Sequence, residues 1–223
     1  MTTTIARPTR QASRAGWLVP VGLILLTLIP IVAGAARVTE LTGAPAITAD
    51  NARFVTSPIP VIVHIVGATL FSILGAFQFV PGLRRRNRWH RLAGRVLVPA
   101  GAAVALSGIW MAVISEHAPA DGVALSALRV IFASLMLAFI ALGVRSIIRR
   151  DFISHGAWMT RAYALAVAAG TQAIVLIPQT VIFGKYEETS RAVFMGAAWV
   201  INLAIAELVI RRRSTRRTVR SAS

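Results

Sequence analysis

Cysteine, charged residues and acidic residues are the three things this sequence has little of. The absence of cysteine excludes disulfides, thiolate metal sites, iron–sulfur clusters and thiol redox chemistry. Charged residues make up only 14% of the 223 residues, against about 25% in a typical soluble domain, while 56% of the residues are hydrophobic. So little polar surface cannot cover a water-soluble globule of this size. The composition therefore indicates a membrane protein.

The sequence motifs of soluble enzymes are missing as well. There is no P-loop, no Gly-x-Gly-x-x-Gly beside a strand, no His-Glu-x-x-His and no Gly-x-Ser-x-Gly. These absences argue against a kinase or hydrolase of the soluble type. The sequence alone assigns no enzymatic activity.

Long hydrophobic runs are what the chain does contain. A helix needs about 20 apolar residues to cross a hydrocarbon core of about 30 Å. We therefore predict an all-α, integral membrane bundle of six transmembrane helices. The predicted spans are residues 17–36, 58–80, 92–114, 123–144, 156–178 and 192–210. Residues 1–16 and 211–223 are predicted basic tails, the second of them disordered, and residues 37–56 a loop.

Basic residues outnumber acidic ones, 24 to 8, for a net charge of +16. Most of the arginines lie in alternate connectors and in the two tails. They are Arg7, Arg10, Arg14, Arg84, Arg85, Arg86, Arg88, Arg91, Arg145, Arg149, Arg150, Arg211, Arg212, Arg213, Arg216, Arg217 and Arg220. This pattern follows the positive-inside rule, so we predict that both termini are cytoplasmic. Arginines at helix ends favour anionic lipids as partners and argue against nucleic acid.

The first span has a competing interpretation. Arginines precede an apolar run that ends in small residues at 33–36, a pattern also typical of a cleaved signal peptide. Cleavage would leave five spans. Because the run is longer than a usual signal-peptide core, we favour a retained span.

Small residues follow histidines along one face of the second and third spans. In the second span His64 shares its face with Gly67, Ala68, Ser72, Gly75 and Gln78. In the third, His90 is followed at helical spacing by Gly94, Gly101, Ala105 and Gly108. Such a stripe lets a flat macrocycle approach the helix backbone, but its commonest use in membranes is close helix packing. We favour packing.

His90 and His155 form the first candidate site. Each lies near the cytoplasmic start of an odd-numbered span, at similar depth, where the helix dipole disfavours the imidazolium form. Neutral imidazole is the form that ligates haem iron. We predict a single b-type haem between them, with Arg95 and Arg161 available for its propionates. The alternative is that both histidines contact the headgroup region.

His64, Arg129 and His117 form a second candidate site near the outer ends of their spans. Arg129 suits a haem propionate or an anionic quinone, but it can equally pair with Asp121 or Glu116 in the adjacent connector. We rank this outer site below the inner pair.

Arg161 and Glu207 are expected at comparable depth in the consecutive fifth and sixth spans. Pairing lowers the cost of burying both charges in a membrane. We predict a structural ion pair, with proton transfer as the alternative.

Two blocks carry a family resemblance: Trp89 to Arg95, reading WHRLAGR, and His155 to Tyr163, reading HGAWMTRAY. Together with His64 and the segment from Asn202 to Glu207, they resemble a family of bacterial membrane proteins known as domain of unknown function 2306. The resemblance covers about residues 58–210 and implies a multi-span membrane fold without an established activity. A looser similarity is to six-span b-type cytochromes and ferric-reductase-like domains.

These observations predict a multi-pass protein of the bacterial cytoplasmic membrane with a haem- or quinone-linked redox role. Its partners would be the bilayer and a quinone or membrane redox protein. Two other classes stay open: a transporter using the polar residues of the membrane interior, and a non-catalytic subunit that binds other helices. The lack of a detectable inverted repeat or of an obviously broken helix pair argues against the transporter. The sequence leaves the oligomeric state open.

Overall fold

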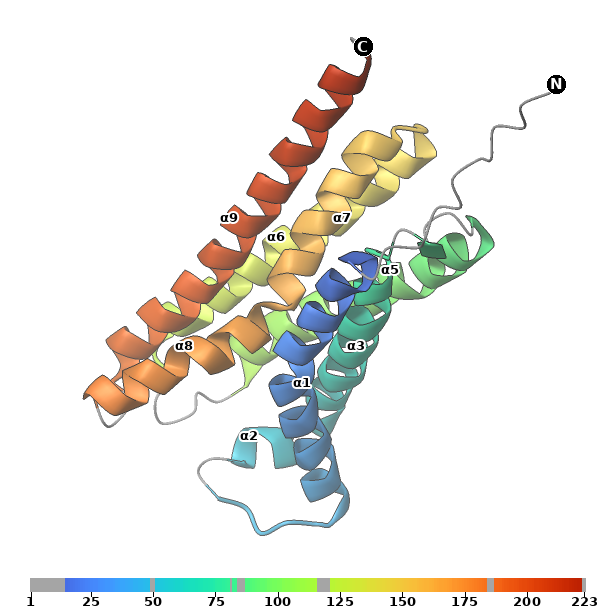
Figure 1. The fold of residues 1–223 in the computed structure, drawn as a ribbon. Helices are drawn as coiled ribbons and strands as arrows, with labels where there is room; N and C mark the ends of the chain where they lie inside the picture. Colours follow the sequence, from blue (N-terminus) through green and yellow to red (C-terminus); the bar gives the residue numbers. More distant parts are fainter. Residues whose placement is uncertain are drawn as a thin grey trace, which may run out of the picture.

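The computed structural model describes residues 15–48, 51–80, 82–83, 87–115, 121–183 and 187–221, and every regular element in these ranges is helical. This confirms the all-α class (Figure 1). The helices are α1 (Ala15–Thr42), α2 (Ala52–Val55), α3 (Pro58–Phe77), α5 (Asn87–Ile114), α6 (Val123–Ile148), α7 (Phe152–Ala166), α8 (Ala168–Phe183) and α9 (Glu188–Ser221).

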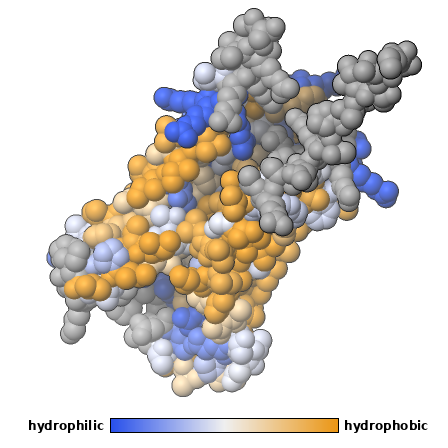
Figure 2. Space-filling view, viewed as in Figure 1, coloured by the Kyte–Doolittle hydropathy of each residue, from blue (hydrophilic) through white to orange (hydrophobic). Residues whose placement is uncertain are grey.

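Six helical segments are long and apolar enough to cross a membrane. They are Gly16–Thr42, Pro58–Phe77, Arg88–Ile114, Val123–Ile148, Phe152–Pro178 and Glu188–Thr215. Each overlaps one predicted span, so the six-span architecture is confirmed. Figure 2 shows apolar residues over the middle of the molecule, with hydrophilic residues gathered towards its ends. That distribution is the one expected of a bundle surrounded by lipid.

Two predictions at the helix ends are wrong. The connector at residues 37–56 is not a plain loop, because α1 continues to Thr42 and α2 forms a further helical turn. The segment after Ile210, predicted to be disordered, continues α9 as far as Ser221. Arginine is a good helix former, and a helix that already exists is extended at little cost, since nucleation is the expensive step.

The two ends of the bundle are named here for use below. The basic end carries the starts of α1 and α5, the turn between α6 and α7, and the end of α9 (Figure 1). The far end carries the end of α1, helix α2, the start of α3, the end of α5, the start of α6, the end of α8 and the start of α9.

Small residues of α3 and α5 are used for helix packing, as the favoured interpretation predicted. A Cβ at Gly67 would lie 3.2 Å from the carbonyl oxygen of Ala100 on α5. The space above Gly75 is filled by the Tyr163 ring of α7. The Tyr163 hydroxyl donates a 2.8 Å hydrogen bond to the carbonyl of Ser72, which ties α7 to α3. Side chains of neighbouring helices therefore occupy the room that a macrocycle would need along this part of the stripe.

The fifth span is interrupted near its middle. Helix α7 ends at Ala166 and α8 begins at Ala168, with Val167 as the turn between them (Figure 1). Asn202 of α9 lies beside the interruption: its Nδ2 donates to the Ala164 carbonyl at 3.0 Å. Its Oδ1 accepts from the Thr171 hydroxyl at 2.9 Å. A side-chain amide at this position satisfies backbone and hydroxyl groups that water cannot reach inside a membrane. Only this span shows such an interruption among the described residues, so no broken helix pair is seen there, but the interruption itself was not predicted from the sequence.

Candidate binding cavity at the far end

Asp121 is the centre of a charged cluster at the far end. It directly precedes Gly122, the N-cap of α6, and its side chain is fully buried. Arg129 of α6 donates to Asp121 Oδ2 at 2.8 Å, and Arg53 of α2 donates to the same oxygen at 3.1 Å. The Nε atom of Arg191, on α9, lies 3.1 Å from Oδ1. One carboxylate thus connects three helices.

Three guanidinium groups surround Asp121, and the Glu188 carboxylate lies close to the neighbouring Gly122. Burial raises the pKa of Asp121, but the hydrogen bond and charge of Arg129, with smaller contributions from Arg53 and Arg191, outweigh it and hold that pKa below its ordinary value. Asp121 is therefore ionised at neutral pH.

Phe54 of α2 extends the cluster toward α1. The guanidinium carbon of Arg53 lies 4.5 Å from the centre of the Phe54 ring, and that of Arg37 lies 4.7 Å from it. Arg37 in turn pairs with Glu40 at 2.6 Å. Such cation–π contacts hold the arginine side chains in one orientation. Helix α2 therefore places Arg53 and Phe54 rigidly at the far end of the bundle.

A cavity of about 290 Å³ lies beside this cluster and reaches the interruption of the fifth span. Its lining combines a few polar groups with an apolar wall, as small-molecule sites usually do. The polar groups are Arg53, His64, Ser115, Arg129 and Gln172. The aromatic residues are Phe54, Phe132 and Trp199, and the last two stack with their ring centres 4.8 Å apart. Leu165, Ala166 and Ala169 contribute the two sides of the helix interruption.

His64 is held in one orientation within this lining. Its Nδ1 lies 3.1 Å from the Val104 carbonyl and 3.1 Å from the Ser107 hydroxyl. Because a carbonyl can only accept, Nδ1 carries the proton that is donated to Val104, and in the neutral ring Nε2 keeps its lone pair. A neutral imidazole of this kind offers a ligand one hydrogen-bond acceptor.

The structure places the residues of the two predicted sites, the outer group and the inner histidine pair, in different surroundings. Of the outer group, His64 and Arg129 line the same cavity, and Arg129 also pairs with Asp121, one of its two expected partners. His117 lies outside the described residues. The far-end site, ranked second from the sequence, is the one whose residues the structure gathers around a cavity.

The predicted inner pair is placed on α5 and α7, both of which pack against α6. His155 Nδ1 donates to the Gly143 carbonyl of α6 at 2.9 Å, which leaves Nε2 for another partner. His90 is half-buried near the start of α5, and Arg95 is exposed. The haem site between His90 and His155 stays a prediction.

Arg161 and Glu207 form the predicted ion pair. Arg161 Nε donates to Glu207 Oε1, and its Nη2 donates to Oε2 at 3.0 Å. The Arg161 guanidinium also lies over the Trp158 ring, 4.6 Å from its centre. Since Glu207 holds this guanidinium through two bonds, a haem propionate would have to compete with a carboxylate for it.

Sequence reasoning missed Arg53, Arg191 and Gln172 as parts of the far-end site. Arg53 and Arg191 were visible as basic residues in connectors where two basic residues stand against two acidic ones. Basic and acidic residues in equal number at one end are a signal that some of them pair within the protein. Gln172 was recognised only as a polar residue of the membrane interior, and nothing in its spacing pointed to His64.

The comparison with known families adds one finding. The family of predicted membrane proteins DUF2306 matches residues 61–210. The chain belongs to DUF2306. Within this DUF2306 protein the match covers His64, Asp121, Arg129, Gln172 and the Arg161–Glu207 pair, whereas α1 and α2 precede it. The resemblance to DUF2306 is thus confirmed, and the looser one to b-type cytochromes is not supported. No curated protein and no solved structure matches the chain.

Proposed function

We propose that this DUF2306 protein binds a quinone-type ligand, an apolar molecule whose ring head carries carbonyl or hydroxyl oxygens, in the far-end cavity. The observation that carries the proposal is the shared lining: His64, Arg129 and Gln172 meet the stacked Phe132 and Trp199 around one space. A quinone role in the bacterial cytoplasmic membrane, with a redox partner there, is the class of function this site suits best.

Each part of the ligand has a matching group. An Arg129 or Arg53 guanidinium donates to a quinone oxygen and favours any negative charge that develops on it. His64 Nε2 accepts a hydrogen bond from a hydroxyl of the reduced ring. The aromatic wall accommodates the ring face. The volume of about 290 Å³ is at the lower end of the range for small-molecule sites, which suits a single ring head better than a macrocycle.

The test is tryptophan fluorescence of the protein in nanodiscs, titrated with a short-chain quinone. We expect saturable quenching that is largely lost in Trp199→Phe, because Trp199 lines the cavity. His64→Ala should weaken the apparent affinity about fivefold to tenfold, as expected for one lost hydrogen bond. Trp110→Phe is the matched control, since that exposed residue is not part of the lining. Quenching that rises linearly and is equal in all variants would show simple partition into lipid and contradict the proposal.

A transport role is a second candidate, and the interrupted fifth span favours it. Discontinuous membrane helices form substrate sites in many transporters, and both sides of this interruption line the cavity. The Arg53 and Arg129 guanidiniums in the cavity lining suit a small organic anion. Counterflow of a labelled aromatic carboxylate into proteoliposomes, lost in Arg129→Gln, would support this role. Ligand binding without any flux would exclude the transport role and leave quinone binding as the remaining proposal.

The haem proposal rests on His155. A ligand histidine usually donates its second ring nitrogen to a carbonyl, which fixes its orientation, and the bond from His155 to Gly143 has this form. A haem held by His90 and His155 would supply one-electron chemistry when bound. The purified protein should then show a Soret band that shifts on reduction and disappears in His155→Ala. A protein grown with haem precursor that shows no such band contradicts this proposal.

A further inference from the structure

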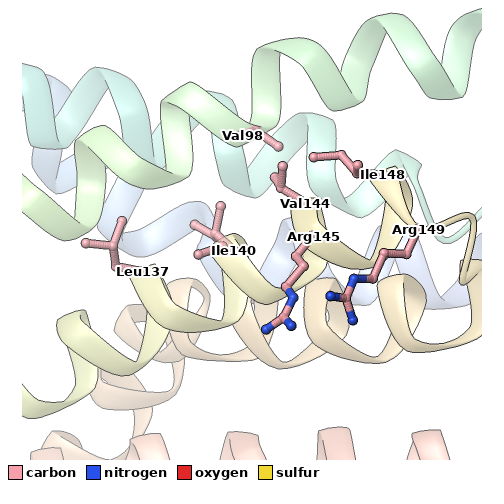
Figure 3. A pocket seen from close by; sticks show the side chains of 8 residues that line it. Val98, Leu137, Ile140, Val144, Arg145, Ile148 and Arg149 are labelled. Atoms are coloured by element: carbon pink, nitrogen blue, oxygen red, sulfur yellow. The ribbon is translucent and has the colours of Figure 1, made fainter.

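A second hollow lies at the basic end, on the side of the bundle where α6 faces α5. Its volume is about 540 Å³, and Figure 3 shows most of its lining on α6. The walls are aliphatic, and two arginines complete the lining. The aliphatic residues are Val98, Leu137, Ile140, Ala141, Val144 and Ile148. This set, with Arg145 and Arg149, is called the α5–α6 groove below.

Arg145 and Arg149 project from the same face of α6, one turn apart (Figure 3). Both are exposed, and within the described ranges no carboxylate lies within ion-pair distance of either. The nearest acid in sequence, Asp151, accepts a hydrogen bond from the Ser154 amide at the start of α7. Two neighbouring guanidiniums thus border the groove without a protein anion to neutralise them.

The C-terminal end of α6, which carries Arg145 and Arg149, is closed by a tight turn. Arg150 adopts a left-handed conformation with φ of 59°, and the amide of Asp151 bonds back to the Ser146 carbonyl at 2.9 Å. This closed turn satisfies a terminal carbonyl and holds the last turn of α6, with Arg145 and Arg149, in a fixed place.

We propose that the α5–α6 groove is a binding site for one anionic phospholipid of the adjacent leaflet. One acyl chain lies along the aliphatic wall, and the phosphate accepts hydrogen bonds from Arg145 and Arg149. Guanidinium groups match phosphate oxygens with paired hydrogen bonds, and anionic lipid is the available anion beside a basic membrane face. An apolar partner helix in the groove would leave both guanidiniums without a neutralising charge. The two arginines therefore favour an anionic lipid as the occupant.

The test is native mass spectrometry of the full chain released from nanodiscs of phosphatidylcholine and phosphatidylglycerol. We expect one retained phosphatidylglycerol, and retention about tenfold lower in the double variant Arg145→Gln/Arg149→Gln. The matched control is Arg211→Gln/Arg212→Gln, which removes the same charge from exposed arginines at the same end. This control should retain the lipid as the parent protein does.

A second variant tests the acyl chain separately. Ala141→Phe fills the groove without changing any charge, and Ala141 is exposed, so the fold should tolerate it. We expect it to lower phosphatidylglycerol retention as well. Equal loss in the control, equal retention of phosphatidylcholine, or a dimer that dissociates in the groove variants would each overturn the proposal. The last result would indicate a partner helix in place of a lipid.

Discussion

Arginine is used in two ways at the two ends of this bundle. At the far end, Arg53, Arg129 and Arg191 converge on a buried carboxylate, and helices α2, α6 and α9 are joined through it. At the basic end, Arg145 and Arg149 lie on an open surface and have no acidic partner in the described chain. The positive-inside rule accounts for the second group but not for the first. An arginine on the side where the rule disfavours it is thus a sign of a site within the protein.

If the arginines at the two ends differ in this way, the largest loss of stability is expected for Asp121→Asn at the far end. The substitution leaves three partly buried guanidiniums without their carboxylate, so we expect a loss of about 3 kcal/mol in the free energy of unfolding. Arg145→Gln, at the basic end, should change it by less than about 0.5 kcal/mol. Denaturant unfolding in detergent, followed by circular dichroism, measures both. Similar losses of unfolding free energy in the two variants would contradict the distinction between structural arginines at the far end and surface arginines at the basic end.

The next largest effect is expected for Gly170→Ala, beside the interruption of the fifth span. A Cβ there would overlap the Leu26 backbone carbonyl, 2.0 Å away, and backbone cannot move aside as a side chain can. We expect a loss of about 2 kcal/mol, typical of overpacking. Gly94→Ala at the basic end is the matched control, because nothing lies within 4 Å of its Cβ position. If both variants unfold at the same denaturant concentration, α1 does not contact α8 as described.

The Arg161–Glu207 pair shows that an arginine nearer the basic end can also be structural when it has a partner. A double-mutant cycle with Arg161→Gln and Glu207→Gln should give a coupling energy of about 1 kcal/mol. The same cycle with Arg145→Gln in place of Arg161→Gln should give none. A coupling energy near zero for the first cycle would mean that the observed pair contributes nothing to stability.

Acid should remove the contribution of Asp121 gradually. Because the folded pKa of Asp121 lies below its ordinary value of 3.8, its stabilising effect is fully present above that pH and is lost as the pH falls through the folded pKa. The difference in unfolding free energy between the parent protein and Asp121→Asn should therefore be constant from pH 7 to about pH 5 and shrink below about pH 4. A difference that already shrinks between pH 7 and pH 5 would mean that the pKa is raised.

The sequence was enough to predict the spans and some of the pairs. Span length and hydropathy are one-dimensional properties, and counting residues from each helix start placed Arg161 level with Glu207. Asp121 likewise precedes Arg129 by only eight residues in the sequence. What could not be predicted depends on how connectors fold back over the bundle. Helix α2 brings Arg53 to Asp121 from 68 residues away, and no local pattern encodes that distance.

The interruption at Val167 was missed because the residues there are good helix formers or small apolar ones, without a local proline or turn sequence. Its signals lie elsewhere. Gly170 allows α1 to approach α8, and Asn202, a polar residue of another span, bonds to the Ala164 carbonyl. A polar side chain in one span can thus be a sequence signal of an irregularity in its neighbour.

The central claim is that ligand binds at the far end and lipid at the basic end. Photolabelling with a short-chain azido-quinone, followed by peptide mapping, tests it most directly. We predict labels on the cavity lining around Phe132, Met195 and Trp199, competed by unlabelled quinone and reduced in His64→Ala. Labels concentrated in the α5–α6 groove, or spread without competition over the lipid-facing helices, would contradict the account.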